Sequence, residues 1–405
     1  MTNSWQRVRL ADTCDLIAGF AFKSKDFGNY FEKVIKITNI EPPFVNMKDL
    51  QGVDLSMYNK DKLQKYIAKK GDYVFAMTGA TIGKLGKICD GEAYINQRVL
   101  MFKPKKDIDK KFLFYILSQK NFYQYVINHI DSESAQANIS ANSIGNYEFN
   151  IPPLDVQKRI AGVLSVLDDK IELNNKINQN LDLQAQSLFN EIYNSSENGV
   201  LSDIVDIVES GNRPKGGACP SGIPSIGAEN IEKFGVYDFS KEKFISEEFF
   251  DNMKRGKVQS GDVLLYKDGA YTGKVSMALD GFPHKKCALN EHVFLLRAND
   301  KCSQFFLYYC LSCDKNKTYL HNLACAKAAQ PGLNQQELLG MPIFIPEYDK
   351  IEKFTDIVNP LMHKIAQNAL ENIKLSAIRD ALLPKLMSGE IDVENIPVSA
   401  IIPNE

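Results

Sequence analysis

The feature that most constrains the fold of this chain is an internal repeat. Residues 71–84 read GDYVFAMTGATIGK, and residues 261–274 read GDVLLYKDGAYTGK. Both stretches begin with Gly-Asp, continue with apolar and aromatic residues, and end in Gly-x-x-x-Gly-Lys. We expect each to form a strand, over residues 73–77 and 263–267, that leads into a glycine-bent loop presenting a lysine.

The repeat continues on both sides of these stretches. The segment NQRVLMF (96–102) corresponds to NEHVFLL (290–296), and later aromatic runs correspond in the same way. The offset grows from 190 residues (71 to 261) to 194 residues (96 to 290) because the second copy has a longer loop after Gly281. Two halves of about 194 residues therefore follow one plan, and 405 residues are too many for one ordinary core.

The composition is that of a globular protein, with 44% hydrophobic and 24% charged residues. No apolar run approaches the roughly 20 residues of a membrane span, and the first residues lack a secretory apolar core. The eight cysteines are scattered, which favours reduced thiols over a disulfide framework. The net charge of −2 argues against a strongly basic nucleic-acid binder but permits local basic loops. We therefore expect a cytoplasmic protein without a membrane partner.

Each half divides into two parts of different character. The first part mixes short β-branched or aromatic runs with glycine turns and one aromatic helix, which predicts a compact α+β globule. The second part has few glycines and a helical periodicity. The segments along the chain are a first globule (1–150), a helical spacer (151–193), a linker (194–199), a second globule (200–345), a second helical spacer (346–390) and a C-terminal tail (391–405).

The two spacers carry apolar residues at intervals of three and four, which is the heptad seam of a coiled coil. In the first spacer the predicted seam comprises Ile160, Leu164, Leu167, Ile171, Asn174, Asn178, Leu181 and Leu188. In the second spacer it comprises Phe354, Val358, Leu361, Ile365, Asn368, Asn372, Leu375 and Leu382. The asparagines recur at the same places in the repeat. A seam asparagine penalises misregistered alignments, because a mismatched amide stays unpaired.

Two such helices in a duplicated chain predict an antiparallel coiled-coil spacer about a pseudo-two-fold axis. Two separate helical hairpins, each against its own globule, are the alternative. Asp155 and its equivalent Asp349 lie where N-caps are expected, with Glu352 as a capping-box partner. Pro360 has no counterpart in the first spacer, so we expect the second helix to kink there or to restart with Asn359 as its cap.

Three motifs that suggest chemistry fail on spacing or context. A phosphate loop needs four residues between its glycines, whereas Gly79 and Gly83 enclose three. The segment EPPF (41–44) has the form of an amino-methyltransferase tetrapeptide, but no glycine-rich cofactor loop precedes it. Cys310 and Cys313 form a single Cys-x-x-Cys within an aromatic run, which favours helix packing over zinc. We therefore predict no catalytic residues, no bound cofactor and no metal site in this chain.

A stiff helical spacer would hold two similar globules at a fixed distance from each other. About 38 helical residues span roughly 57 Å, more than the ~35 Å of one turn of B-DNA. This architecture resembles the specificity subunit of type I restriction–modification systems. The resemblance covers essentially the whole chain. Its most specific pieces are the two Gly-Asp stretches, residues 150–181 and the segment LLPKLMSGEI (382–391).

The resemblance implies a role in DNA recognition. In that family the specificity subunit is not catalytic, and its two target-recognition domains read a bipartite, asymmetric site on double-stranded DNA. Its helices dock two methyltransferase subunits that methylate adenine, and added restriction (motor) subunits cut the DNA. S-adenosylmethionine, ATP and Mg²⁺ are thus expected in the partner subunits. Pro360 and Arg379 depart from the repeat symmetry, so the two docking sites are not expected to be identical.

Sequence readout needs side chains with directional donors and acceptors, while other basic residues bind phosphates. In the first globule the candidates for DNA binding are Lys23, Lys25, Thr78, Lys84 and Arg98. In the second globule they are Arg213, Lys215, Lys267, Tyr271, Lys274, His284, Lys285 and Lys286. For each of them the alternative is an ordinary solvated surface position. Asn96 and Asn290 lie in strand-like runs and are expected to be structural.

Two other function classes compete with a DNA-specificity subunit. An enzyme acting alone would need clustered carboxylates for a metal ion or a glycine-rich cofactor loop, and the sequence offers neither. A scaffold or regulator, whose paired globules bind protein and not DNA, is the alternative that the near-neutral charge leaves open.

Overall fold

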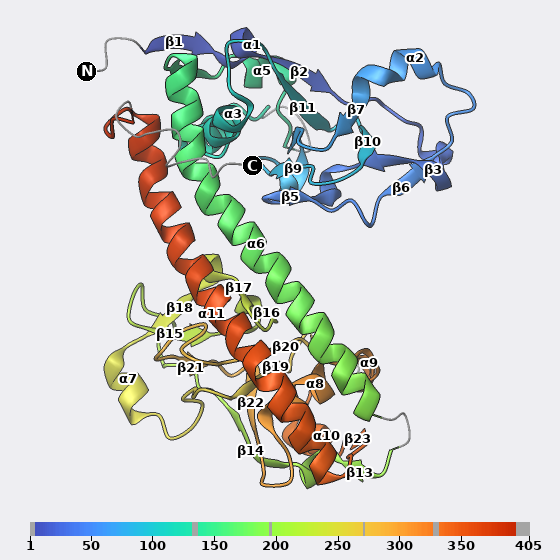
Figure 1. Cartoon of the computed structure of the whole chain (residues 1–405), viewed down its shortest axis with the longest axis vertical. Coiled ribbons are helices and arrows are strands. Elements are labelled where there is room, and N and C mark those ends of the chain that lie inside the picture. Colours follow the sequence, from blue (N-terminus) through green and yellow to red (C-terminus); the bar gives the residue numbers. More distant parts are fainter. Residues whose placement is uncertain (1–4, 132–136, 194–196, 270–271, 327–331, 394–405) are drawn as a thin grey trace. The chain divides into compact units, whose positions relative to one another are not determined.

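The computed structural model describes residues 5–131, 137–193, 197–269, 272–326 and 332–393 (Figure 1). The chain divides into two compact units. The first unit comprises residues 1–168 and 377–405, and the second comprises residues 169–376. The second unit is therefore one continuous segment, whereas the first combines both ends of the chain.

The first unit is built on two sheets and a terminal strand pair. Its larger sheet has the order β2-β11-β8-β9-β5-β4 and its smaller sheet the order β6-β3-β10-β7. The larger sheet comprises β2 (Cys14–Ala18), β11 (Val99–Pro104), β8 (Tyr73–Ala76), β9 (Leu85–Lys87), β5 (Phe44–Val45) and β4 (Ile40–Glu41). The smaller sheet comprises β6 (Gln51–Val53), β3 (Phe27–Ile35), β10 (Glu92–Ile95) and β7 (Ile67–Lys69). Strand β1 (Gln6–Arg9) pairs antiparallel with β12 (Glu148–Ile151).

Short helices flank the two sheets of the first unit, and the one that contains Leu63 packs with the smaller sheet. They are α1 (Leu10–Thr13), α2 (Lys60–Leu63), α3 (Lys110–Leu117), α4 (Lys120–Asn128) and α5 (Ala141–Gly145). The core between sheet and helices is aromatic, and Phe75, Phe102, Phe112 and Phe122 are each at most 1% exposed. Burial of such large side chains is the main stabilising contribution, at roughly 1.5–3 kcal/mol for each.

The second unit has the same plan. Its larger sheet, in the order β14-β22-β19-β20, comprises β14 (Val205–Ser210), β22 (Val293–Ala298), β19 (Val263–Tyr266) and β20 (Val275–Met277). Its smaller sheet comprises β18 (Lys243–Ile245), β15 (Ile223–Ile226) and β21 (Ala288–Leu289). Two strand pairs accompany them, β16 (Ile231–Lys233) with β17 (Val236–Tyr237) and β13 (Gly199–Val200) with β23 (Pro342–Ile343). The helices are α7 (Glu247–Asn252), α8 (Gln304–Ser312), α9 (Asp314–Cys325) and α10 (Gln335–Leu339).

The structure confirms the predicted repeat and the α+β class. Strands β8 and β9 correspond to β19 and β20, and helices α3, α4 and α5 correspond to α8, α9 and α10. One difference is that β4–β5 joins the larger sheet through β9, whereas β16–β17 is a separate pair. All eight cysteines are free thiols, and Cys310 is packed in the core of the second unit, as predicted. No helix of the described residues is long and apolar enough to cross a membrane.

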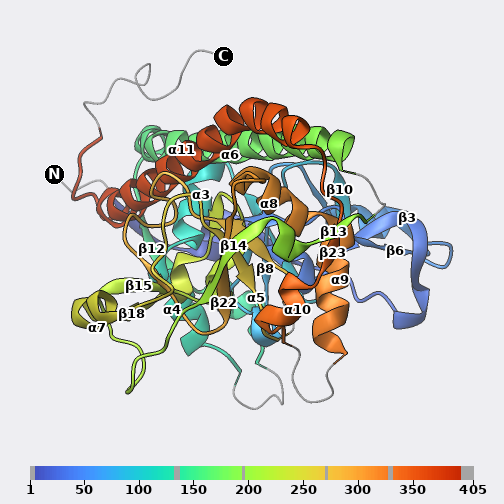
Figure 2. The same ribbon diagram turned by 90° about the horizontal axis from the view of Figure 1, so that it is seen from below.

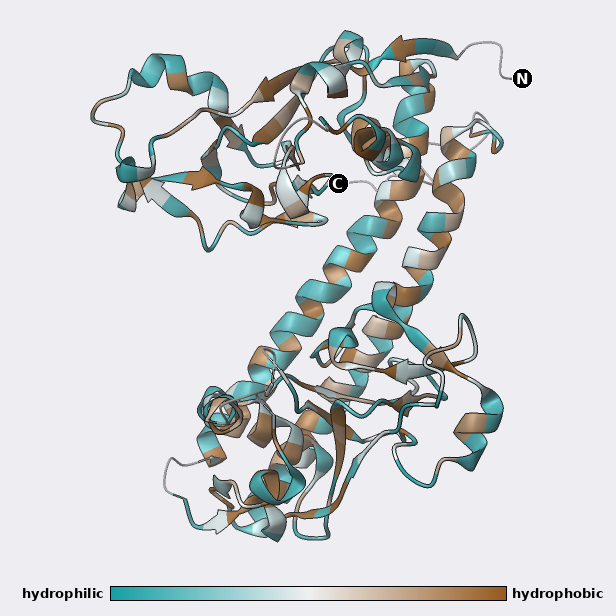
Figure 3. Ribbon diagram, turned by 180° about the vertical axis from the view of Figure 1, so that it is seen from behind, coloured by the Kyte–Doolittle hydropathy of each residue, from teal (hydrophilic) through white to brown (hydrophobic). Residues whose placement is uncertain are grey.

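Two long helices run through both units, α6 (Leu154–Ile192) and α11 (Tyr348–Met387). In Figure 3 they show alternating hydrophobic and hydrophilic stretches, as expected for helices with one buried face. Both Figure 1 and Figure 2 show them side by side. Most predicted apolar seam residues of each unit are buried or half-buried, for example Leu164, Val358 and Ile365 at 2% exposure or less.

Asparagines of the two helices bond to one another within the second unit. Nδ2 of Asn174 donates to Oδ1 of Asn372 at 2.9 Å, and Nδ2 of Asn368 donates to Oδ1 of Asn178 at 2.8 Å. Along α6 from Asn174 to Asn178, the partner on α11 changes from Asn372 to Asn368, so the helices are antiparallel here. Asn174 is the repeat equivalent of Asn368, and Asn178 is that of Asn372. Each pair is thus the image of the other under the repeat, as a local two-fold relation requires.

Further polar groups surround the first asparagine pair. Asn174 also donates to the carboxylate of Glu371 at 2.8 Å, and this bond is the main reason that the pKa of Glu371 lies below its usual range. Lys170 adds an ion pair to the same carboxylate at 3.4 Å. Oδ1 of Asn174 has no hydrogen-bond partner among the described residues. The layer is therefore polar but incompletely satisfied, which is the usual cost of register control in a coiled coil.

The same two helices also meet in the first unit. Arg379 of α11 forms an ion pair with Asp168 of α6 at 2.8 Å, and Tyr115 donates to the other oxygen of Asp168 at 2.6 Å. Leu386 and Met387 of α11 enter the same apolar core as Ile160. The alternative of separate helical hairpins is wrong, because α6 pairs with α11 in both units.

The predicted helix ends need two corrections. Helix α6 begins at Leu154 and α11 at Tyr348, so Asp155 and Asp349 lie in the first turn and are not N-caps. Their carboxylates still interact favourably with the positive end of the helix dipole. The predicted restart at Asn359 is also wrong, because α11 continues through Pro360. Pro360 is exposed, so water can bond to the backbone carbonyl that lacks its usual N–H donor.

Candidate nucleic-acid interface

The Gly-Asp start of each repeated stretch has a structural role. Gly71 and Gly261 have φ values of 86° and 97°, which glycine adopts without the strain of a Cβ. The next residue in each copy is a buried aspartate that accepts a backbone N–H three residues upstream, at 2.9 Å for Asp72 and 2.8 Å for Asp262. The motif is therefore a turn with an internal cap, placed directly before a central strand.

The two buried aspartates are neutralised differently. Lys103 and Lys110 contact Asp72 at 2.5 and 3.1 Å. Burial alone would raise the pKa of Asp72, but the hydrogen bonds from Lys103, the Lys69 N–H and Lys110 outweigh it, so the pKa lies below its usual range.

Asp262 meets a single guanidinium, that of Arg297, through bonds of 2.6 and 3.0 Å. Arg297 is the repeat equivalent of Lys103. The equivalent of Lys110 is Gln304, whose side chain accepts the N–H of Ala298 instead.

Outside residues 270–271, the Gly-x-x-x-Gly-Lys loops have similar glycine conformations and the same closing bonds in both units. The second glycine of each loop, Gly83 or Gly273, has a φ of 90° or 97°. Two backbone bonds close each loop, and in the first unit they join Ala76 to Gly83 and Lys84 at 3.1 and 2.9 Å. In the second unit Tyr266 makes the corresponding bonds at 3.0 and 2.9 Å. The predicted strand and glycine-bent loop are confirmed as a β-hairpin.

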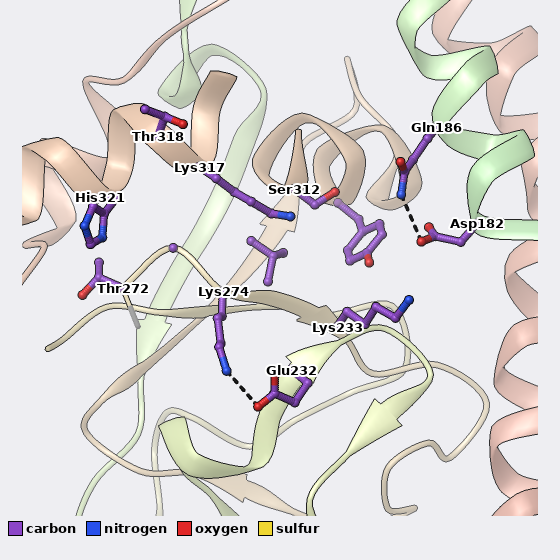
Figure 4. Close-up of a pocket in the computed structure, with 13 residues that line it drawn as sticks. Asp182, Gln186, Glu232, Lys233, Thr272, Lys274, Ser312, Lys317, Thr318 and His321 are labelled. Atoms are coloured by element: carbon purple, nitrogen blue, oxygen red, sulfur yellow. Dashed lines mark hydrogen bonds and ion pairs between the residues drawn. The ribbon is translucent and has the colours of Figure 1, made fainter. Parts of the chain in front are cut away.

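The lysines at the ends of these loops lie in different surroundings. Lys84 is exposed. Lys274 is 28% exposed and forms an ion pair with Glu232 at 2.8 Å. It lines a cavity of about 430 Å³ together with residues of α6, α8 and α9 (Figure 4). In the first unit the ring of Tyr123 lies against Gly83, whereas its equivalent in the second unit is Lys317, which lines this cavity.

The other candidates of the first unit fall into two groups. Lys23 and Lys25 are exposed at the start of the segment that leads into β3. Thr78 is 3% exposed, and its hydroxyl donates to the carbonyl of Ala137 at 2.9 Å, which indicates a structural role. Arg98 is exposed and donates to Oδ1 of Asn138 at 3.2 Å. A bridge between Thr78 and Asn138 thus brings two of the five candidates together.

The candidates of the second unit are mostly paired with carboxylates. Ion pairs join Arg213 to Glu291, Lys267 to Asp268, Lys274 to Glu232 and Lys286 to Asp251, and His284 forms a hydrogen bond with Glu242. Lys215 and Lys285 are exposed, and Tyr271 lies outside the described residues. Because the acids offset these cations locally, the net charge of −2 does not hide a strongly basic face here.

Sequence reasoning missed part of a polar turn that the structure places at the same position in each unit. The turn follows β10 in the first unit and β21 in the second, and its residues are Asn96-Gln97-Arg98 and Asn290-Glu291-His292. In the second unit His292 contacts Asp268 at 3.0 Å and Glu291 at 3.4 Å, and Glu291 contacts Arg213. The signal was present in the sequence, since NQR and NEH are aligned with a retained asparagine and changed neighbours.

The expectation that Asn96 and Asn290 are structural is confirmed. Oδ1 of Asn96 accepts the N–H of Gln97 at 3.0 Å, and Oδ1 of Asn290 accepts the N–H of His292 at 2.9 Å. Among the residues that the structure describes, no three His, Cys, Asp or Glu side chains gather in a way that would hold a metal ion.

Comparison with known proteins agrees with this duplicated architecture. The family model described as "Type I restriction modification DNA specificity domain" matches twice, over residues 2–183 and 195–376. The MjaIX specificity subunit of Methanocaldococcus jannaschii is 26% identical over 325 residues, covering 74% of this chain and 73% of the relative. The HindI specificity subunit of Haemophilus influenzae is 25% identical over 423 residues, covering 85% and 90%.

A solved structure shares the fold. The S subunit of a type I restriction–modification system from M. genitalium superposes with a TM-score of 0.57 at 16% identity, covering 95% of this chain and 97% of that one. The two family matches together span most of the sequence, and each includes one α+β globule with much of the long helix that follows it. The chain therefore belongs to the family of type I restriction–modification specificity subunits.

Proposed function

We propose that this chain is the DNA-reading subunit of a type I restriction–modification complex. Each unit reads one half of a bipartite, asymmetric site on double-stranded DNA, and the chain itself carries no catalytic residues. One observation carries the proposal: the specificity domain occurs twice with one retained framework and different polar residues at equivalent exposed positions. A repeated framework with changed surface chemistry is what two different half-sites require.

The partners follow from the same proposal. Two methyltransferase subunits dock on α6 and α11, and restriction (motor) subunits complete the assembly in the cytoplasm. S-adenosylmethionine, ATP and Mg²⁺ are bound by those partners. The predicted DNA-binding residues remain candidates on this view, with exposed lysines such as Lys23, Lys25 and Lys84 suited to phosphates.

The test is single-molecule sequencing of methylated bases in cells with and without the gene for this chain, in the presence of its methyltransferase subunit. Loss of one bipartite, asymmetric adenine-methylation motif on deletion supports the proposal. An unchanged set of methylated sites, together with no salt-dependent DNA binding by the purified complex, overturns it and favours a protein-binding scaffold.

The spacing between half-sites offers a second test. Because α6 and α11 are paired, one heptad is inserted into each helix, at matching positions of the repeat. Each heptad adds about 10 Å, so the gap in the recognised site is expected to lengthen by about three base pairs with both half-sites unchanged. A changed half-site with an unchanged gap contradicts the proposal.

A further inference from the structure

The polar turns after β10 and β21 are held by the same set of bonds. In the first unit the N–H of Asn96 donates to the carbonyl of Ile35, and the N–H of Met77 donates to the carbonyl of Arg98, both at 3.0 Å. In the second unit the N–H of Asn290 donates to the carbonyl of Ile226 at 3.0 Å. The bond from Lys267 N–H to the carbonyl of His292 is the equivalent of the Met77 bond, at 3.1 Å.

The side chain that ends each turn is supported from the same place. Arg98 donates to Asn138, which forms a bridge with Thr78. The equivalent bridge in the second unit joins Asp268 to Gly332, and here Asp268 contacts His292 at 3.0 Å. In the first unit the supporting residue is Asn138, whereas in the second unit it is Asp268, which is the equivalent of the bridge partner Thr78. The turn itself keeps its position. Both turns hold their outward side chains on a rigid base, which specific recognition needs.

The outward side chains of the two turns differ in hydrogen-bonding character. Gln97 and Arg98 are exposed and offer mainly donors, with one amide acceptor. Glu291 and His292 are 34% and 44% exposed, and Glu291 offers acceptors only. Oε1 of Glu291 contacts Arg213 and His292, whereas Oε2 has no hydrogen-bond partner among the described residues. Oε2 is buried in this position, so the carboxylate must rotate and release Oε1 from Arg213 and His292 before a ligand can reach the unpaired oxygen.

We infer that these two turns read base edges, with Gln97 and Arg98 specifying one half-site and Glu291 and His292 specifying the other. The inference rests on the proposed function and names the residues that would carry it out. An arginine donates to the two acceptors of guanine in the major groove, and a glutamine pairs with adenine. A glutamate accepts from the exocyclic amine of cytosine. The first turn therefore selects purine acceptors, and the second selects an amino group.

The experiment uses the full chain with its methyltransferase subunit, expressed in a host without other adenine methylation. Methylated sites are sequenced for the unaltered chain and for two variants, Arg98→Ala and Glu291→Gln. Two controls change the same residue types at exposed positions outside the turns, Arg7→Ala and Glu248→Gln. Complex assembly and the melting temperature are measured for every variant, so that a loss of folding is separated from a loss of recognition.

Each turn variant is expected to lower discrimination at one base pair of one half-site by roughly ten- to a hundredfold, leaving the other half-site unchanged. The two variants must affect different half-sites, and the two control variants must leave both half-sites unchanged. If a variant complex assembles but methylates no site, it is tested on DNA with each base pair of the site changed in turn. Recovery with one such change supports the inference, and no recovery overturns it.

Two failures can be told apart. An unaltered chain that directs methylation to a bipartite motif, with both turn variants giving that same motif, overturns the inference and leaves the proposed function standing. An unaltered chain that directs methylation to no specific motif overturns both.

Discussion

The two units of this chain share a framework and differ in how they complete it. Both units have glycines in the left-handed conformation, a buried aspartate that accepts a backbone N–H, and an asparagine that accepts a backbone N–H in the polar turn. The cations that neutralise the aspartates, the residues against the loop glycines and the side chains after the turn asparagines differ. Residues that fix the backbone are therefore retained by the repeat, and residues that complete a contact or face outward are free to change.

The buried aspartates give the largest expected difference between the units. Within the described residues, Arg297 is the one cation within 4 Å of the Asp262 carboxylate, whereas Asp72 has two. Replacing Arg297 with alanine leaves an uncompensated buried charge and is expected to cost about 3 kcal/mol of unfolding free energy. Lys103→Ala is expected to cost about 1 kcal/mol because Lys110 remains.

Urea unfolding of the purified chain measures both effects. Arg7→Ala, which breaks an exposed ion pair with Glu148, is the matched control and should change the unfolding midpoint little. Equal losses for Arg297→Ala and Lys103→Ala would show that the second lysine contributes nothing.

The asparagine pairs give the next effect in size. Asn368→Leu removes the donor to Asn178 and is expected to cost about 1–2 kcal/mol, because the half-buried amide loses its partner. The double variant Asn178→Leu with Asn368→Leu is expected to recover that loss, since an apolar pair replaces a polar one. Thermal unfolding of the single and double variants measures the coupling. A double variant less stable than either single variant would contradict this account.

Acid should weaken the first unit through Asp72. Its pKa is below the usual range in the folded chain, so its stabilising contribution is present above about pH 4, the unfolded value, and is lost as the pH falls through the folded pKa. Melting temperatures between pH 6 and pH 3 should fall less steeply for Asp72→Asn than for the unaltered chain. Parallel curves for the two proteins would show that Asp72 does not contribute to the loss of stability in acid.

The loop glycines give the smallest difference. Alanine at Gly83 or Gly273 requires a left-handed conformation and is expected to cost about 1 kcal/mol in either unit. At Gly83 the new Cβ would also come within 2.6 Å of the Tyr123 ring, which must move. At Gly273 the nearest atom is the Lys317 carbonyl oxygen at 3.4 Å. Gly83→Ala should therefore be the more destabilising by a few tenths of a kcal/mol, and Tyr123→Ala in the same chain should remove that excess.

Much of the fold could be predicted from the sequence because its signals are local or periodic. The hairpin loops follow from glycines at fixed spacing, and the coiled-coil seam follows from apolar residues at intervals of three and four. The antiparallel pairing followed from the equivalence of Asn174 with Asn368. The helix starts were misplaced because the chain enters each helix earlier than the aspartates suggested, with the carbonyls of Pro153 and Glu347 accepting the first helical N–H groups.

The surroundings of the candidate site could not be predicted in the same way. Lys274 meets Glu232 across 42 positions in sequence, and Asp72 meets Lys103 across 31. Such partners are set by tertiary packing, for which a single sequence gives no period or spacing. The positions of basic residues in the sequence therefore did not indicate which of them form ion pairs in the second unit. The aligned turns are a second signal in the sequence, because a retained asparagine beside changed neighbours indicates the same backbone with different side chains.

The division of the chain into units also bears on its synthesis. The second unit is contained in residues 169–376, so all of its strands and helices are available once that segment has left the ribosome. The core of the first unit includes Leu386, Met387 and Val393, which are made after that segment. The half that is translated first therefore completes its core last, and it keeps apolar surface open while the other half folds. A chain that stops shortly after residue 376 would leave the second unit intact and the first unit exposed to proteases.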